Sequence, residues 1–540
     1  MKLRNKIAAI ATVLTSMAMA LMYAAPAQPQ YVLTPDQKLR LAEGVIENYY
    51  VESVNPDSIV DQAIIAMLKT LDPHSAYTTP EETRELNQPL EGKFSGIGIQ
   101  FNMVKDTLYV VQTTPGGPCE KVGVRPGDRI ISANDTIISG KKLTNSGIFK
   151  VLRGPKGSVV ELKVKRGDEP ELLSFTIVRD DIPIYSISDT YMANDTTGYI
   201  AISRFAESTA EEMVKAVNKL LKKGMRNLII DLSDNTGGYL GAACALSEGF
   251  LAKGDPVLST QGLNSPRASY TVEADGKFKG RVVVIVNQYS ASAAEILAGA
   301  LQDNDRAVIV GRRTFGKGLV QRPFPFPDGS MIRLTTSRYY TPSGRCIQKH
   351  YDKGHSEEYQ LDLYNRYTGG ELWSADSVKL DSTQRFETLR HHRVIYGGGG
   401  IMPDVFVPVD TTHFSKYYRD LIAKRVIIEY CLDYVNTNRK ELLKKYRDDD
   451  AFHTKFAVTD ELLQSLIDRG IAEGVAFVED DWQRSRRYIA AIVKGLLSRD
   501  LYDNGSYARA VASINPDMQA ALSVINDPER YNGILRGTGE

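Results

Sequence analysis

The first pattern along the chain is helical. Apolar side chains in residues 41–49 recur at intervals of three and four residues, the spacing of one face of an α-helix. Thr34 and Gln37 stand where an N-cap and its capping-box partner would stand. Similar spacing continues toward residue 71, so we expect a helical domain over residues 31–90.

Short strands and Gly-rich turns follow in residues 91–182. Apolar and polar positions alternate over 97–103 and again over 160–164, which is typical of half-buried β-strands. The segment has the size of a small domain. We therefore expect a compact β-rich domain over residues 91–182.

Strand and helix patterns alternate from 183 to 345. Val282–Val286 are consecutive apolar residues, which predicts a strand buried on both faces. Helical patterns at 209–221, from 241 and from 293 separate the strands. This rhythm indicates βαβ units and a parallel sheet covered by helices.

The remainder divides into three parts. Residues 346–394 are polar and irregular, which suggests an insertion or a long surface loop. Residues 395–410 return to a strand pattern, and we assign them to the same domain as 183–345. Residues 411–540 have helical spacing and form a helical extension. The fold class expected is a multidomain α/β protein.

Composition excludes several classes of protein. Lys+Arg and Asp+Glu both number 66, so the charge balance gives no reason to expect nucleic acid as a partner. Four cysteines in 540 residues cannot form a disulfide scaffold. The histidines and cysteines do not have metal-ligand spacing. We expect neither a metal nor another cofactor.

The N-terminus has the pattern of an export signal. Three basic residues precede an apolar run over residues 7–25, and small residues follow it. We expect residues 1–27 to be a cleaved signal peptide, with an uncleaved membrane anchor as the alternative. Both place the rest of the chain outside the cytoplasm, in the periplasm or cell envelope.

Two segments offer groups for nucleophilic catalysis. Ser290-Ala-Ser292-Ala-Ala-Glu295 opens a helix directly after a buried strand, which exposes a serine beside free backbone N–H groups. The alternative is a capping box between Ser292 and Glu295. Lys317 lies between two glycines in apolar surroundings, where its pKa would fall and the amine would act as a base. The alternative there is a surface turn.

Three further positions have two interpretations each. Gln321 lies within reach of Lys317 if the segment is helical, whereas in a straight strand the two are about 13 Å apart. Gly237-Gly238 follows a strand and either aims a backbone N–H into a crevice or is a plain turn. His74 is interpreted as a buried or capping histidine rather than a catalytic one.

Several motifs together carry a resemblance. The chain resembles the carboxy-terminal processing peptidases, serine proteases with a Ser–Lys dyad and a PDZ domain. The motifs occur in that family's order and are Leu71–Ser75, Gly96–Ile99, Val124–Asp128, Asp231–Gly238, Ser290–Ile296, Thr314–Gln321 and Gly400–Asp404. The resemblance implies a PDZ domain at 91–182 and a crotonase/Clp-like protease core at 183–345 and 395–410.

The resemblance also implies roles for single residues. Ser292, rather than Ser290, is then the nucleophile, and Lys317, 25 residues later, is the base. Gln321 orients the lysine. The oxyanion hole is built from the N–H groups of Gly238 and Ala293, although the choice of Gly238 over Gly237 stays open.

The PDZ resemblance implies how substrates are chosen. Gly96, Ile97, Gly98 and Ile99 would hold a peptide's terminal carboxylate, and the peptide would add as a strand after Ile99. Arg153 either links this site to the protease core or is an ordinary surface arginine.

The function implied is an extracytoplasmic serine endopeptidase acting on proteins or peptides with accessible C-termini. One alternative is a catalytically inactive PDZ adaptor. Another is a Ser–His–Asp protease with His74 as its base, which Ser292 between alanines disfavours. Whichever function holds, we expect the helical extension, residues 411–540, to serve a homo-oligomer or an adaptor partner.

Overall fold

The computed structural model describes residues 33–104, 106–167 and 169–539. Its contacts divide the chain into two units, Met1–Leu68 and Lys69–Glu540. Within the described ranges, no helix combines the length and apolarity needed to cross a membrane. The expected signal peptide over residues 1–27, with the alternative anchor over 7–25, lies outside them.

The first unit contains two of the expected helices, α2 (Pro35–Tyr49) and α3 (Pro56–Lys69). The expected capping box opens α2, because Gln37 Oε1 accepts from Thr34 N at 3.1 Å. The apolar side chains of α2 are not buried. The helical pattern is therefore confirmed, while the apolar stripe of α2 stays exposed.

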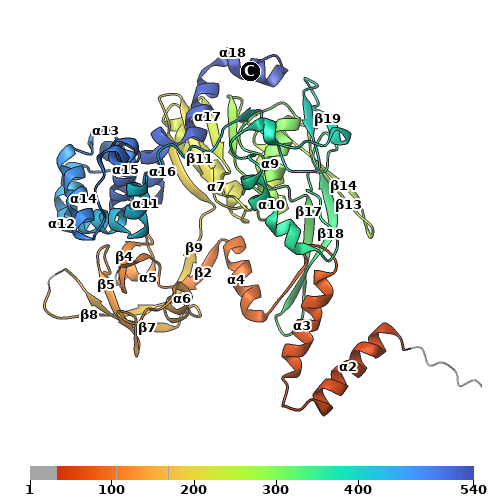
Figure 1. Ribbon diagram of the computed structural model, residues 1–540, viewed down its shortest axis with the longest axis horizontal. Coiled ribbons are helices and arrows are strands. Elements are labelled where there is room, and N and C mark those ends of the chain that lie inside the picture. The colour runs from red at the N-terminus through yellow and green to blue at the C-terminus, as the bar shows by residue number, and fades with distance from the viewer. Residues whose placement is uncertain (1–32, 105, 168, 540) are drawn as a thin grey trace, which may run out of the picture. The chain divides into compact units, whose positions relative to one another are not determined.

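Near its start, the second unit contains a small β-rich domain (orange in Figure 1). Its sheet has the order β3-β4-β5-β7-β8, and β6 pairs with β5. Strand β3 lies at an edge of this sheet, so its outer backbone groups have no partner strand. The elements of this region are α4 (Pro80–Glu91), β2 (Lys93–Gly96), β3 (Ile99–Val104), β4 (Thr107–Thr113), α5 (Pro118–Lys121), β5 (Arg129–Ala133), β6 (Thr136–Ile137), α6 (Asn145–Leu152), β7 (Val159–Lys165), β8 (Leu173–Val178) and β9 (Asp180–Pro183).

A six-stranded sheet forms the centre of the next region, in the order β10-β11-β12-β15-β16-β21. All its pairings are parallel except that of β10 with β11. The elements are β10 (Ile187–Met192), β11 (Thr197–Ile202), α7 (Thr209–Lys222), β12 (Asn227–Asp231), α8 (Leu240–Glu248), β15 (Val282–Val286), α9 (Ala293–Asp303), β16 (Val308–Gly311) and β21 (Val405–Phe406).

Helices cover both faces of this sheet. Val282, Val284 and Val286 of β15 pack on α7, α8 and α9, whereas Val283 and Ile285 pack on α17 (Pro516–Asn526) and α18 (Pro528–Arg536). All five residues of β15 are fully buried. The prediction of a strand buried on both faces is confirmed, but the second cover comes from the far end of the sequence.

A second sheet stands beside the first. It has the order β1-β18-β13-β14, with β17 also paired to β18. These strands are β1 (Ala76–Thr78), β13 (Pro256–Gly262), β14 (Ser265–Thr271), β17 (Leu319–Pro325) and β18 (Met331–Tyr340).

Residues 346–394, expected as an insertion or surface loop, contain regular structure. Their elements are α10 (Ser356–Thr368), η1 (Ala375–Ser377), η2 (Ser382–Gln384), β19 (Arg385–Glu387) and part of β20 (Val394–Tyr396). Helix α10 buries Tyr359 and Arg366. Because these buried side chains carry polar groups, an apolar periodicity does not reveal the helix.

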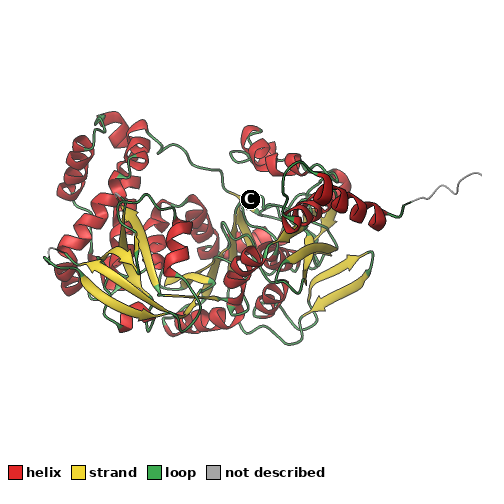
Figure 2. Cartoon of the chain, turned by 90° about the horizontal axis from the view of Figure 1, so that it is seen from below, coloured by secondary structure: helices red, strands yellow, loops and turns green. Residues whose placement is uncertain are grey.

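The helical extension packs in two places. Helices α11 to α16 form their own hydrophobic core around Cys431, Leu466 and Val493, and the helices appear red in Figure 2. Helices α17 and α18 return to the central sheet. The elements are α11 (Lys416–Ala423), α12 (Val426–Lys445), α13 (Asp449–Lys455), α14 (Asp460–Ala472), α15 (Glu479–Leu501), α16 (Asn504–Val511) and η3 (Ala512–Ile514).

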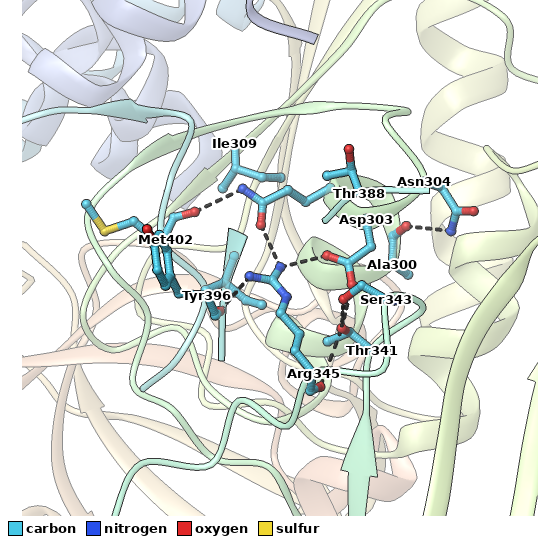
Figure 3. Close-up of polar contacts among 12 residues, drawn as sticks. Ala300, Asp303, Asn304, Ile309, Thr341, Ser343, Arg345, Thr388, Tyr396 and Met402 are labelled. Carbon is cyan, nitrogen blue, oxygen red and sulfur yellow. Dashed lines mark hydrogen bonds and ion pairs between the residues drawn. The ribbon is translucent and has the colours of Figure 1, made fainter. Parts of the chain in front are cut away.

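A buried arginine joins three segments of the α/β region. Figure 3 shows the Arg345 guanidinium, which donates to Asp303 at 2.7 Å, to Gln302 at 2.8 Å and to the Tyr396 carbonyl at 2.8 Å. The side chains of Arg345 and Asp303 are both 0% exposed. The pair therefore fixes the end of α9 against the segment that follows β18.

Removing this arginine should destabilise the protein strongly, because it leaves the buried Asp303 carboxylate without its cationic partner. We expect Arg345→Ala to lower the free energy of unfolding by about 3–5 kcal/mol, measured by urea denaturation followed by circular dichroism. Arg322→Ala, at an exposed position, is the control and should change it by about 0.5 kcal/mol at most. Equal midpoints for the two variants would contradict this assignment.

Candidate active site

Ser292 occupies a strained turn between β15 and α9. Its backbone has φ 56° and ψ −116°, a combination that costs a non-glycine residue about 1–3 kcal/mol and is common at functional sites. Ser290, by contrast, is fully buried; its hydroxyl donates to the Leu232 carbonyl at 2.7 Å and accepts from Asn287 N at 2.9 Å. Ser290 is therefore engaged in holding the loop.

Glu295 connects the serine turn to the lysine loop. One oxygen of its carboxylate, Oε2, accepts from Ser292 N and from Lys317 N, each at 2.8 Å. The other oxygen accepts from Gly316 N at 2.7 Å and from the Thr314 hydroxyl at 2.5 Å. Because each backbone nitrogen lies 2.8 Å from the same oxygen, the backbones of Ser292 and Lys317 are close together.

The capping-box interpretation of Ser292 and Glu295 is also correct, since the reciprocal arrangement opens α9. It describes only part of what the carboxylate does. Glu295 is 0% exposed, and a buried carboxylate stays charged only when hydrogen bonds replace its water. Its four hydrogen bonds oppose burial, which still raises the pKa of Glu295, and they hold two loops together.

Lys317 lies just before β17, in a loop that is mostly buried. Burial lowers the pKa of its ammonium to about 8, and the positive charge of Arg333 acts in the same direction. Glu295 and Asp72 act in the opposite direction. A lysine with this pKa is partly neutral near physiological pH, as a general base requires.

The side chain of Gln321 forms no hydrogen bond with Lys317 in the described part of the chain. It belongs to β17, so the strand alternative applies, and its amide donates to Thr335 Oγ1 of β18 at 3.2 Å. Thr335 in turn donates to Asp72 Oδ1 at 3.0 Å. The direct lysine–glutamine hydrogen bond implied by the resemblance is absent from the described contacts, since the amide of Gln321 is directed to β18.

His74 lies near this lysine but is held elsewhere. Its Nε2 forms a hydrogen bond with the Tyr359 hydroxyl at 2.8 Å, and its backbone N donates to Asp72 at 2.9 Å. Burial, followed by the charge of Lys317, lowers the pKa of His74 to about 3. The imidazole is therefore neutral and anchors the segment against α10.

The Gly237-Gly238 turn lies against the serine. A Cβ at Gly237 would be 2.8 Å from Ser292 Cβ. Gly237 N already donates to Asn235 Oδ1 at 2.8 Å. Neither Gly238 N nor Ala293 N has an acceptor among the described residues. Of the two glycines, Gly238 is thus the one with a free N–H.

The Gly96–Ile99 loop, which is expected to bind the terminal carboxylate of a peptide, connects β2 to β3. Its carbonyls face inward, where Ile97 O accepts from Cys119 N at 3.0 Å and Gly98 O accepts from Thr114 N at 2.9 Å. Within the described part of the chain, the N–H groups of Ile97 and Gly98 have no acceptor. Such a loop offers free donors to an anion.

Arg153 ends α6 and touches three elements. Its guanidinium lies over the Phe94 ring at 4.6 Å and the Phe149 ring at 4.4 Å, and Nη1 donates weakly to Gln88 of α4 at 3.5 Å. Burial lowers its pKa. These contacts do not fit an ordinary surface arginine.

Pattern analysis missed two groups at this site. The sequence predicts only a capping role for Glu295, although an acidic residue inside the otherwise apolar stretch 293–301 signals a buried charge. Asp72 offers no such signal, because its bonds to His74 and Ser75 are those of a local turn, whereas its third donor, Thr335, is distant in sequence.

Comparisons with known proteins identify the family of this chain. The family model of peptidase family S41 matches residues 196–356, a PDZ-domain model matches 95–177, and a family of unknown function, DUF8443, matches 417–503. Carboxy-terminal processing protease CtpB of Bacillus subtilis (strain 168) is 36% identical over 364 residues, 67% of this chain and 74% of the relative. CtpA of the same strain is 33% identical over 58% of this chain and 66% of the relative.

Two solved structures are also similar. A photosystem II D1 C-terminal processing protease aligns with 58% of this chain and 91% of its own, at 27% identity and a TM-score of 0.34. The PDZ domain of a carboxy-terminal protease from Vibrio cholerae in complex with peptide aligns with 17% of this chain and 97% of its own, at 29% identity and a TM-score of 0.16. On the family models and the Bacillus relatives, the chain belongs to the carboxy-terminal processing proteases, serine-type peptidases of family S41 that carry a PDZ domain.

Proposed function

We propose that this protein cleaves peptide bonds with a Ser292–Lys317 dyad. The observation that supports the proposal best is the Glu295 carboxylate, because one of its oxygens bonds the backbone N–H of both residues. The depressed pKa of Lys317 supplies the base that a serine hydroxyl needs.

The proposed reaction has two steps. Ser292 Oγ attacks the peptide carbonyl carbon while its proton passes to Lys317 Nζ, and the N–H groups of Gly238 and Ala293 stabilise the oxyanion. Collapse breaks the C–N bond, and the leaving amine takes the proton from Lys317. Water, deprotonated by Lys317, then hydrolyses the acyl ester and frees Ser292.

In this scheme Gln321 supports the lysine indirectly. Its hydrogen bond to Thr335, and that of Thr335 to Asp72, hold a carboxylate whose charge favours protonated Lys317. The direct orienting contact is therefore not part of the proposal.

The PDZ domain is proposed to select the substrate. The free N–H groups of the Gly96–Ile99 loop would bind a terminal carboxylate, and the peptide would add as a strand to β3. Arg153, which reaches from α6 to Phe94 and Gln88, would transmit occupancy of this site toward α4.

We further propose that the protein is exported. The basic, apolar and small-residue pattern over residues 1–27 supports cleavage of a signal peptide and a periplasmic or cell-envelope location. Residues 183–345 and 395–410 form the proposed catalytic domain, to which α17 and α18 contribute the second helical layer. Nothing in the site favours an inactive adaptor, since both dyad residues are present.

Loss of either dyad residue should abolish cleavage. We expect Ser292→Ala and Lys317→Ala each to lower kcat by at least about 1000-fold, measured on an unstructured protein with EDTA present. Ser269→Ala and Lys279→Ala, at exposed positions, are the matched controls and should cleave like the parent. Cleavage by Lys317→Ala together with loss in His74→Ala would instead identify His74 as the base.

The rate should rise with pH. Because the neutral amine is the base and burial lowers the pKa of Lys317 to about 8, kcat/KM is expected to increase through pH 8 and to level off above it. The measurement is a pH series with a short fluorogenic peptide. A rise centred well below pH 7 would argue against the lysine.

The Glu295 contact should be needed for rate rather than for binding. A glutamine retains one acceptor oxygen, so it cannot bond all four donors, and the serine and lysine loops shift. We expect Glu295→Gln to lower kcat by about 100-fold with little change in KM. Glu273→Gln, at an exposed position, is the control, and unchanged kcat in Glu295→Gln would refute the role.

A further inference from the structure

A groove runs between β3 and α6 in the PDZ domain, and the helical extension forms one of its sides. Twelve described residues line it, and none is Asp or Glu. Three of them are the arginines 153, 425 and 499. The apolar members are Phe94, Ile99, Phe101, Met103, Val111 and Phe149. Such a lining suits a peptide that is both apolar and anionic.

Two of these arginines belong to the extension. Arg425 is the N-cap of α12, and its guanidinium donates to Met103 O of β3 at 2.9 Å. Arg499 lies in α15, and its carbonyl accepts from Gln112 of β4 at 3.2 Å. The extension is therefore bonded to both strands nearest the groove.

A third contact indicates that the fit is close. A Cβ added at Gly127 of the PDZ domain would stand 3.1 Å from Asn436 Oδ1 of α12. Gly127 also has φ 90°, which favours glycine. The extension therefore contacts the PDZ domain outside the groove as well, at Gly127.

The charges of the arginines are not equally available. Arg499 Nη2 lies 2.7 Å from the buried Asp500 carboxylate, and Arg153 is stacked between two rings. Arg425 is exposed and forms no ion pair within the described ranges. It uses one N–H on Met103, and its guanidinium has further donors for a carboxylate.

The position of Arg425 corresponds to a definite part of a bound peptide. A peptide whose terminus lies at the Gly96–Ile99 loop would run along β3 toward Met103. Ile99 and Met103 are four residues apart, about 13 Å in a strand. Arg425 would therefore meet the peptide some three to five residues before its C-terminus.

We infer that the helical extension completes the PDZ groove and that Arg425 selects substrates with an acidic residue three to five positions before an apolar C-terminus. This inference rests on the proposed capture of C-termini by the PDZ domain. It assigns a specificity role to a region that the model of a family of unknown function matches.

The test measures binding to the full chain carrying Ser292→Ala, which prevents turnover. Three labelled peptides share an apolar C-terminus and differ in having Asp, Asn or Lys at the fourth position from the end. We expect the Asp peptide to bind about 5-fold more tightly than the Asn peptide at low salt, the size of an exposed ion pair. The preference should weaken as salt is added.

A second variant separates charge from folding. Arg425→Ala should remove the preference for Asp while leaving the affinity for the Asn peptide unchanged, and Arg425→Glu should favour the Lys peptide. Arg419→Ala, an exposed arginine of α11 that does not line the groove, is the matched control and should keep the preference.

The possible failures are distinguishable. Equal binding of the Asp and Asn peptides, or an equal loss for all three in Arg425→Ala, would overturn the inference and leave C-terminal capture intact. If a matched peptide with an amidated C-terminus binds as well as the free acids, the proposed capture itself fails, and the inference fails with it.

Discussion

The arrangement of the active site depends on a carboxylate that water cannot reach. Moving a charged group of this kind out of water costs several kcal/mol. Three backbone N–H groups and one hydroxyl offset part of that cost at Glu295, where burial still raises the pKa of the carboxyl. The donors come from two loops that are distant in sequence. Because each loop satisfies the charge, neither can move away without leaving it unpaired, and the serine turn and lysine loop are held as one body.

The same burial sets the chemistry of the lysine. The surroundings that exclude water from Lys317 disfavour its ammonium form, while Glu295 and Asp72 limit the effect. An isolated apolar pocket would lower the pKa further, and an exposed loop would leave it near its ordinary value. The balance leaves a lysine whose amine is partly neutral near neutral pH.

The helical extension serves two regions of the second unit. Its last two helices cover the face of the central sheet that α7, α8 and α9 leave open, so the catalytic sheet is completed by the end of the chain. Its earlier helices contact β3 and β4 of the PDZ domain through Arg425 and Arg499. One helical segment therefore packs on both the central sheet and the PDZ domain.

Local sequence patterns predicted most of the helices and strands, and they also predicted that Lys317 is buried. The all-apolar run Val282–Val286 predicted a doubly buried strand, and Lys317 between glycines predicted a buried base, because each depends on side chains adjacent in the chain. What covers a strand depends on distant residues, so the return of α17 and α18 could not be read from their own amphipathic pattern.

The same distinction applies inside the site. The motif Ser-x-x-Glu predicted a capping box, which is present, but only the fold brings the lysine loop to the same carboxylate. The partner of Gln321 depended on whether its segment was strand or helix, and the pairing of β17 with β18 decided it in favour of Thr335. The sequence by itself determined which groups can react, whereas tertiary structure decided which of them meet, because hydrogen bonds and burial join residues that no local pattern relates.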